Sequence, residues 1–337
     1  MSSCISVFLN KEVERKLFIF FSIILLLVSG LRYDIGVDYL SYLSLYQDSF
    51  EINPEINEKG FAILFHTLYR LGISYDIVSF ILSFFTIYFV FKYINRYSTN
   101  HLFSILIFFT FGQFYFNTFN SVRQTLVTYA FYLLLIYIKE RKFIIYSIYV
   151  IFLAFILHST AIILIPLYFV LLRSYSFKTR IIFFILISFS TIIVIKLIEV
   201  SPYSVYLNLD KYTGNVSPTT YLLLIISCLI FIIGCISKIR SEDEVILFNL
   251  NTILISVLIL SLLFQGTPII MVTNRLSYYF SPILIVLMPI CIYRMRLLSN
   301  RSIIIIVLSI CFSLLCIMTL VANGEENNLI PYKTILL

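Results

Sequence analysis

Arg123 lies inside a long hydrophobic stretch, within residues 116–124, which read Phe-Asn-Thr-Phe-Asn-Ser-Val-Arg-Gln. A fixed cation at membrane depth costs several kcal/mol unless it faces a cavity or a partner. Asn120 favours the N-cap of a helix, which would place Arg123 in the first turn, where free backbone N–H groups and a guanidinium together suit phosphate. We therefore predict that Arg123 and Gln124 bind an anion. The alternative is an arginine that snorkels to the membrane interface.

Further polar groups stand where other hydrophobic segments end on the same predicted side of the membrane. They are Arg32-Tyr33-Asp34-Ile35-Gly36-Val37-Asp38, Glu58-Lys59-Gly60, His158-Ser159-Thr160 and Thr273-Asn274-Arg275. Because a guanidinium can hold an anion by paired hydrogen bonds, Arg32 and Arg275 join Arg123 as candidate anion ligands. The alternatives are a local pair between Arg32 and an aspartate, and an interfacial anchor for Arg275.

Three of these residues could accept the proton of a hydroxyl group. They are Asp38, Glu58 and His158. Carboxylates and imidazoles are the usual general bases of enzymes, and we favour His158 or Asp38 without separating them. The alternatives are a helix cap for Glu58, whose charge suits a helix N-terminus, and a satisfied core position for His158.

The composition indicates an integral membrane protein. Hydrophobic residues make up 61% of the 337 residues and charged residues 12%, against about 25% charged residues in a soluble domain. The net charge of +7 comes largely from short clusters of Lys and Arg between hydrophobic segments. Such clusters follow the positive-inside rule, so they indicate cytoplasmic loops and no nucleic-acid partner.

Alternation of these clusters with hydrophobic segments predicts an all-α membrane helix bundle of about eleven spans in one domain, residues 1–337. The N-terminus is then cytoplasmic and the C-terminus outside. The predicted spans are 17–31, 76–94, 101–117, 120–138, 143–157, 159–172, 180–198, 221–237, 245–265, 277–293 and 302–321.

Two segments are too short for ordinary spans. Residues 61–71 are apolar and predict a short outer interfacial helix. Residues 143–172 must cross and return between two basic clusters, which leaves about 15 residues, or about 22 Å of helix, per limb. His158 stands at the turn of this hairpin, and short helices that meet at depth usually line a cavity.

The cysteines show no metal-binding spacing, and no nucleotide-binding or zinc motif is present. The outer carboxylates form no clear metal site either. We therefore expect neither a metal nor another cofactor, and we disfavour an ATP-driven pump.

At the polar groups above, the chain resembles the EpsG family of bacterial polysaccharide polymerases, which are related in role to the Wzy O-antigen polymerases. The similar pieces are Arg32…Gly36-Val37-Asp38-Tyr39…Tyr42, Glu58-Lys59-Gly60, Asn120-Ser121-Val122-Arg123-Gln124, His158-Ser159-Thr160-Ala161 and Pro331-Tyr332-Lys333-Thr334. They occur in the expected order over residues 32–334. Together they are fairly specific.

The resemblance implies a glycosyltransferase of the bacterial inner membrane whose site faces the periplasm or exterior. It implies transfer of a growing glycan from undecaprenyl diphosphate to the non-reducing end of a lipid-linked repeat unit. The product would be an O-antigen, capsule or exopolysaccharide. The expected partners are the undecaprenyl-diphosphate-linked oligosaccharide, membrane lipid, a chain-length regulator and a flippase.

A diphosphate leaving group needs concentrated positive charge, preferably from arginine. The residues that we expect to bind it are Arg32, Arg123, Gln124 and Arg275.

Other classes of membrane protein also fit part of the pattern. A flippase for lipid-linked oligosaccharides would need arginines too, but it more often shows two related halves, and no internal repeat is evident. A membrane acyltransferase that modifies a surface glycan could use His158 as its base. A purely structural scaffold would leave the polar outer residues unexplained.

Overall fold

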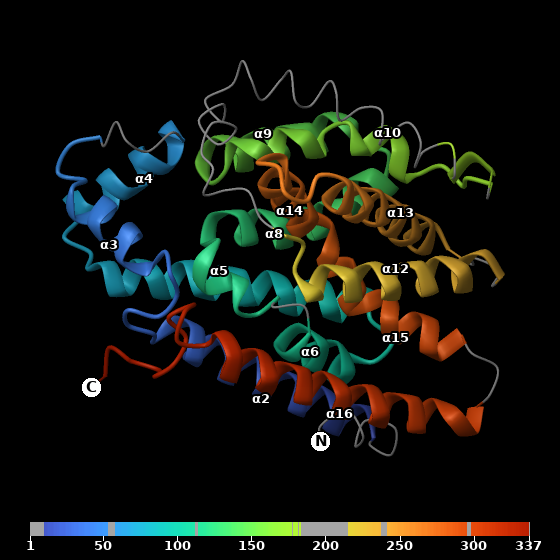
Figure 1. Ribbon diagram of the computed structural model, residues 1–337. Helices are drawn as coiled ribbons and strands as arrows, with labels where there is room; N and C mark the ends of the chain where they lie inside the picture. Colours follow the sequence, from blue (N-terminus) through green and yellow to red (C-terminus); the bar gives the residue numbers. More distant parts are fainter. Residues whose placement is uncertain are drawn as a thin grey trace. The chain divides into compact units, whose positions relative to one another are not determined.

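The computed structural model describes residues 10–52, 58–111, 114–176, 178–180, 182, 215–236, 241–294 and 298–336. This part of the chain is all-helical, as predicted, with one isolated antiparallel bridge between Arg32 and Thr334. The helices are α2 (Lys11–Gly30), α3 (Tyr39–Gln47), α4 (Lys59–Arg70), α5 (Tyr75–Tyr97), α6 (His101–Thr110), α7 (Asn117–Asn120), α8 (Val122–Lys139), α9 (Phe143–Ile156), η1 (Ser159–Leu164), α10 (Leu167–Leu171), α12 (Pro218–Ile236), α13 (Glu242–Leu263), α14 (Ile269–Phe280), η4 (Ser281–Ile283), α15 (Leu284–Arg294) and α16 (Leu298–Asn323) (Figure 1).

Several of these helices are long and apolar enough to cross a bilayer, which indicates a membrane protein. They are Tyr75–Tyr97, Pro218–Ile236, Glu242–Leu263, Ile269–Arg294 and Arg301–Asn323. Each overlaps a predicted span. Most of the predicted span at 180–198 lies outside the described residues, and the count of about eleven spans stays a prediction.

Two boundaries differ from the predicted ones. α6 ends at Thr110, where the predicted span continues to 117, and the single turn α7 follows it. Ser121 is the N-cap of α8, and Asn120 closes α7. The prediction that Asn120 caps the helix of Arg123 is therefore wrong. Its side-chain oxygen instead accepts a hydrogen bond from the backbone N–H of Val37, at 2.7 Å.

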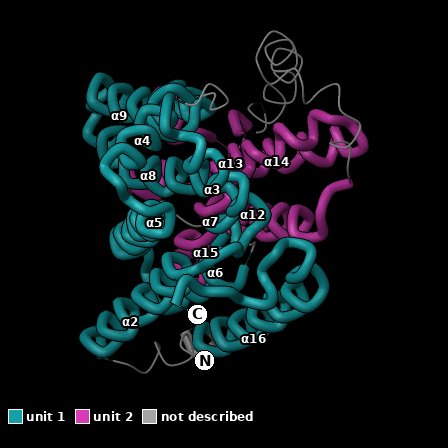
Figure 2. The backbone as a smooth tube through the Cα atoms, turned by 90° about the vertical axis from the view of Figure 1, so that its left-hand side faces the viewer, with its two compact units in different colours: residues 1–168, 295–337 teal, residues 169–294 magenta. Residues whose placement is uncertain are grey.

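The chain divides into two compact units (Figure 2). The first contains Met1–Tyr168 and Met295–Leu337, and the second contains Phe169–Arg294. In the second unit, α13 packs against α12 and α14, and Glu244 in its first turn pairs with Arg294 of α15. The prediction of a single membrane domain stays a prediction.

The core of the first unit forms where α5 packs between α2 and α8. One face of α5 is buried, at Val78, Val90 and Tyr93, and the opposite face is exposed, at residues such as Ile77 and Ile81. At this helical spacing α5 buries one stripe against its neighbours, and the apolar residues on its other face suit contact with lipid. The ring of Tyr93 lies 4.4 Å from that of Tyr132 on α8, centroid to centroid, which fixes the two helices together.

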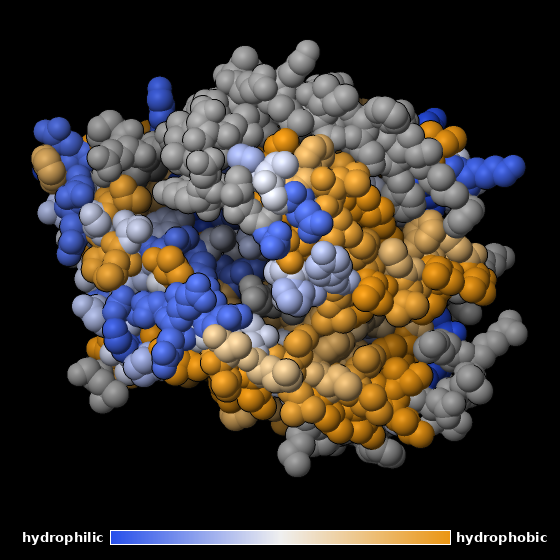
Figure 3. All heavy atoms as spheres, viewed as in Figure 1, coloured by the Kyte–Doolittle hydropathy of each residue, from blue (hydrophilic) through white to orange (hydrophobic). Residues whose placement is uncertain are grey.

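The surface of the first unit has an apolar and a polar region. Figure 3 shows hydrophobic residues over α16, while hydrophilic residues gather near α3 and the C-terminal end of the chain. Ile303, Ile310 and Ile317 recur every second turn of α16 and are each more than half exposed. An exposed apolar face on a helix of this length suits contact with lipid.

The predicted hairpin turn is present, and a short helix, α4, lies where the outer interfacial helix is predicted; its place at the outer surface stays a prediction. α9 ends at Ile156, His158 is extended at φ −155° and ψ 114°, and the short helix η1 follows at once. The hydroxyl of Tyr146 on α9 donates to the carbonyl of Leu164 at 2.6 Å, which ties the two limbs together. α4 packs against α9, so Glu58, just before α4, lies near the end of α9.

Gly60 allows this close approach. A Cβ at Gly60 would meet the Phe155 carbonyl oxygen, as well as the Phe155 ring at 2.7 Å. Phe155 stands three residues before His158. The absence of a side chain at Gly60 therefore lets α4 bring Glu58 against the hairpin turn.

We expect Gly60→Ala to lower the free energy of unfolding by about 1–3 kcal/mol, because the added methyl overpacks the α4–α9 contact. Activity should fall further than stability alone explains, because Glu58 moves from His158. Unfolding in detergent and activity in membranes measure the two effects. Gly72→Ala, just after α4, is the control, because its Cβ meets nothing within 4 Å while its φ of +72° disfavours any side chain. It should therefore lower stability without moving Glu58, and its activity should fall only as its stability does. If Gly60→Ala loses no more activity than Gly72→Ala at equal loss of stability, the close approach does not position Glu58.

Candidate functional site

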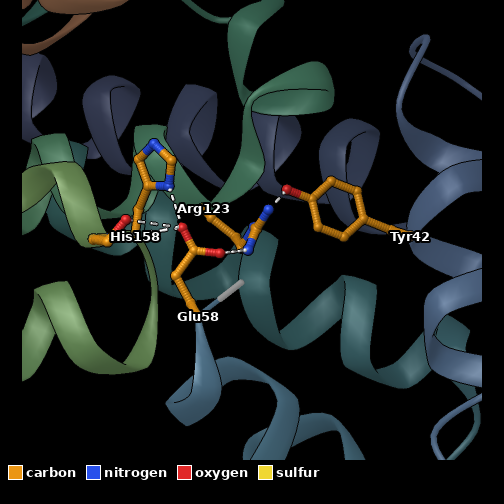
Figure 4. A network of polar contacts seen from close by, with 5 residues as sticks. Tyr42, Glu58, Arg123 and His158 are labelled. Atoms are coloured by element: carbon orange, nitrogen blue, oxygen red, sulfur yellow. Dashed lines mark hydrogen bonds and ion pairs between the residues drawn. The ribbon is translucent and has the colours of Figure 1, made fainter. Parts of the chain in front are cut away.

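Glu58 is the centre of a buried polar network (Figure 4). It occupies the N-cap position of α4, but its side chain makes no capping bond. Its Oε2 lies 2.5 Å from Nη1 of Arg123, and its Oε1 lies 3.0 Å from Nδ1 of His158. The Glu58 side chain is only 4% exposed. The carboxylate thus joins three segments that are far apart in the sequence, and it does not act as a helix cap.

Arg123 is the second residue of α8, which confirms the prediction that it lies in the first turn of a helix. Its Nε donates to the hydroxyl of Tyr42 at 3.0 Å. Its guanidinium lies 4.9 Å from the ring centroid of Phe61 and 5.6 Å from that of Tyr42. Carboxylate, hydroxyl and aromatic faces therefore surround the cation, and it is not a snorkelling arginine.

His158 is held by the same carboxylate. The residue is 7% exposed, and the backbone N–H and hydroxyl of Ser159 each lie 3.4 Å from Glu58 Oε1. A carboxylate only accepts hydrogen bonds, so Nδ1 of His158 carries the proton that it donates. In the neutral ring Nε2 then carries the lone pair. In Figure 4, Nε2 points away from Glu58.

Opposing effects act on the pKa of Glu58. Burial raises this pKa, whereas the hydrogen bond from His158 and the positive charge of Arg123 lower it, and the result is about 2. Glu58 is therefore a carboxylate at neutral pH and a weak base. Its geometry and its pKa both fit a group that orients His158 and balances Arg123.

Arg32 is a second buried cation, 3% exposed. Its Nη1 donates to the carbonyl of Ser29 and, at 2.9 Å, to the hydroxyl of Ser83. Its guanidinium lies 5.1 Å from the ring centroid of Phe119. Within the described part of the chain no carboxylate pairs with Arg32. The alternative of a local Arg–Asp pair is therefore wrong, because Asp34 pairs with Lys333 instead.

The remaining predicted residues lie on different elements. Asp38 is the N-cap residue of α3, one turn before Tyr42. Gln124 is buried on α8, next to Arg123. Arg275 lies on α14, in the second compact unit. The anion-binding and base assignments of these residues stay predictions.

Tyr42 is a site residue to which the sequence assigns no role, although it ends the first of the motifs that resemble the EpsG family. Aromatic residues near outer helix ends are expected for an interfacial belt, so its type alone carries little information. Its position four residues after Asp38, on the same face of a short helix, is the signal that could have found it.

A comparison with protein families identifies the family of the chain. The model of the EpsG family matches residues 15–334, so the chain belongs to the EpsG family. This membership supports a membrane polysaccharide polymerase-like, glycosyltransferase-like function. No curated protein and no solved structure matches the chain significantly.

We expect Glu58→Gln to change how stability depends on pH. The folded pKa of about 2 lies below the ordinary value of 4.5. The carboxylate therefore stabilises the fold fully above pH 4.5, and this contribution disappears as the pH falls through about 2. Unfolding in detergent should show a gap between wild type and Glu58→Gln at pH 6 that narrows towards pH 2.

Glu12→Gln is the control, because Glu12 pairs with Lys16 at the surface and its side chain is 70% exposed. Exposed pairs contribute little to stability. A gap of equal size for the Glu12 and Glu58 variants would contradict the assignment of a buried, shared carboxylate.

Proposed function

We propose that the protein polymerises a bacterial cell-surface polysaccharide, such as an O-antigen, capsule or exopolysaccharide, at the outer face of the inner membrane. The donor is a growing glycan on a lipid diphosphate, namely undecaprenyl diphosphate, and the acceptor is the non-reducing end of a lipid-linked repeat unit. Membership in the EpsG family supports the polymerase class. The observation that carries the mechanism is the Glu58 carboxylate shared between Arg123 and His158.

In the proposed step, His158 is the general base. The bond between the anomeric carbon of the donor glycan and the diphosphate oxygen breaks, and a bond from that carbon to the acceptor hydroxyl oxygen forms. The hydroxyl proton moves to Nε2 of His158, and the diphosphate leaves with the bonding electron pair. Glu58 supports this role because it accepts a hydrogen bond from the Nδ1–H of His158 and stabilises the imidazolium that forms.

The geometry favours His158 over the other candidate bases. Glu58 has a pKa of about 2, and both of its oxygens are engaged. Asp38, the N-cap residue of α3, stays a candidate base. We therefore propose His158 as the base and Glu58 as its positioning residue.

The leaving diphosphate is proposed to meet Arg32, Arg123, Arg275 and Gln124. Arg32 and Arg123 contribute differently. The charge of Arg123 is balanced by Glu58. The remaining N–H donors of Arg123 would therefore contribute mainly directed hydrogen bonds to the diphosphate. No carboxylate within the described residues balances Arg32, so its positive charge would act at full strength on an anion that approaches it.

The assay for this proposal supplies purified protein in lipid with a synthetic repeat unit linked to undecaprenyl diphosphate. A polymerase produces a ladder of longer lipid-linked glycans and releases undecaprenyl diphosphate. A flippase would move the unit across the bilayer without a ladder, and an acyltransferase would leave its length unchanged. No ladder from the wild type with its cognate unit would reject the polymerase proposal.

We expect His158→Gln to lower the rate of ladder formation by about 100- to 10,000-fold, the range for loss of a general base. His66→Gln is the matched control. His66 lies on α4, and its Nδ1 is 3.1 Å from the carbonyl oxygen of Ser49, outside the network. A His158→Gln rate close to that of His66→Gln would contradict the assigned base.

A charge-balanced pair of variants separates two functions of Arg123. Arg123→Met alone leaves Glu58 buried without its cation, which typically costs about 3–5 kcal/mol. The double variant Arg123→Met/Glu58→Gln removes both charges and should recover much of that stability. We expect the ladder rate of the double variant to stay well below that of Glu58→Gln alone, because a diphosphate ligand is also lost. Equal rates would limit Arg123 to balancing Glu58.

A further inference from the structure

Residues 328–336, the terminal segment, return to the loop of residues 31–38 that follows α2, the first loop (Figure 1). Arg32 and Thr334 form an antiparallel bridge. The N–H of Tyr33 donates to the Lys333 carbonyl at 3.0 Å, and the N–H of Ile335 donates to the Leu31 carbonyl at 3.0 Å. A short two-stranded backbone contact thus joins the two segments.

Side chains strengthen this contact. The amine of Lys333 lies 2.5 Å from Oδ2 of Asp34, whose side chain is 19% exposed. The side-chain amide of Asn328 donates to the Asp34 carbonyl at 2.8 Å, and the Asn328 carbonyl accepts from Gly36 N–H at 2.9 Å. The hydroxyl of Tyr332 donates to the Val28 carbonyl at 2.7 Å. The terminal segment therefore holds the first loop along its length.

The other side of the first loop faces the start of α8. Gly36 has a φ of +93°, and a Cβ there would meet the Asn120 side-chain oxygen at 2.7 Å and the Phe119 carbonyl at 2.9 Å. The N–H of Val37 donates to the same Asn120 oxygen at 2.7 Å. Asn120 stands three residues before Arg123. The first loop is thus clamped between the terminal segment and the α7–α8 junction.

Two routes lead from this clamp to the candidate site. One runs through Asn120 to the first turn of α8, which carries Arg123. The other runs through Asp38, where α3 begins, to Tyr42, whose hydroxyl accepts from Arg123 Nε. Both routes end on the guanidinium that binds Glu58, so a displaced first loop would shift Arg123 in two ways.

We propose that the terminal segment is a positioning element of the glycosyl-transfer site: through Lys333 and Asn328 it holds the first loop against Asn120 and so fixes Arg123 and Tyr42. This inference rests on the proposed polymerase function. Lys333 and Asn328 contact Asp34 of the first loop and act on the site only through this loop. The Lys333–Asp34 pair spans 299 residues of the chain. This contact gives a structural reason for the motif at Pro331-Tyr332-Lys333-Thr334 to occur together with the motif that begins at Arg32.

The test changes the charges of the Lys333–Asp34 pair and measures the rate of ladder formation from the synthetic lipid-linked repeat unit. Lys333→Glu puts two like charges in contact and should lower kcat at least about tenfold, because small displacements of reacting groups have large effects on rate. KM for the repeat unit should change less, because the proposed effect is on alignment. The double variant Asp34→Asn/Lys333→Glu removes the repulsion, and an asparagine tolerates the φ of +49° at this position and keeps an acceptor for Asn328, so kcat should recover to within about threefold.

Arg70→Glu is the matched control, because it makes the same change of charge at an exposed position in the last turn of α4. Its kcat should stay near that of the wild type. Membrane yield and unfolding in detergent report folding separately. A chain ended after Asn327 tests removal of the whole segment, and it should reach the membrane but form little ladder.

The outcomes separate the two proposals. A wild-type protein without a ladder rejects the polymerase function itself. An active wild type with an unchanged kcat in Lys333→Glu overturns the positioning proposal. A fall in kcat that the double variant does not recover also overturns it, as does a fall that matches the loss of folded protein. If the shortened chain does not fold, Lys333→Glu and the double variant still decide whether the terminal segment positions the site.

Discussion

The buried carboxylate of Glu58 is the constraint on which the candidate site depends. A carboxylate that is 4% exposed is costly unless charged or polar groups surround it. Arg123 and His158 provide these partners, one at each oxygen. Arg123 and His158 also depend on Glu58. Without this carboxylate, Arg123 would have no anionic partner and the ring of His158 would not be oriented. The three buried polar groups therefore stabilise one another only when the three segments that carry them meet within hydrogen-bond distance.

The fold meets this requirement by bringing backbones together at small residues. Gly60 lets α4 approach the Phe155 carbonyl on α9, which places Glu58 beside the hairpin turn. Gly36 lets the first loop approach the residues that precede α8. The lengths of the hairpin limbs matter for the same reason. Because α9 ends at Ile156, His158 lies in an irregular turn where its side chain can reach Glu58.

The chemistry divides among residues that look alike in the sequence. Arg32 and Arg123 are both cations after or within hydrophobic segments, but Arg123 is paired with a carboxylate and Arg32 is held by Ser29, Ser83 and an aromatic face. Glu58 and His158 both could act as bases, but the pKa of about 2 makes Glu58 the partner that holds the ring. Environment, and not residue type, therefore distinguishes the two arginines from each other and the Glu58 carboxylate from the proposed base His158.

The sequence by itself determined the membrane class, the helical architecture, the turn at His158, the short helix after Glu58 and the motifs of the EpsG family. These are local properties, because hydrophobic runs, basic clusters and short motifs are readable within a few tens of residues. Only the tertiary structure decided that Glu58 joins Arg123 and His158, that Asn120 serves the first loop and that Lys333 pairs with Asp34. The partners of Glu58 lie 65 and 100 residues away. Contacts across such distances depend on how helices pack, and they leave no spacing in the sequence from which they could be predicted.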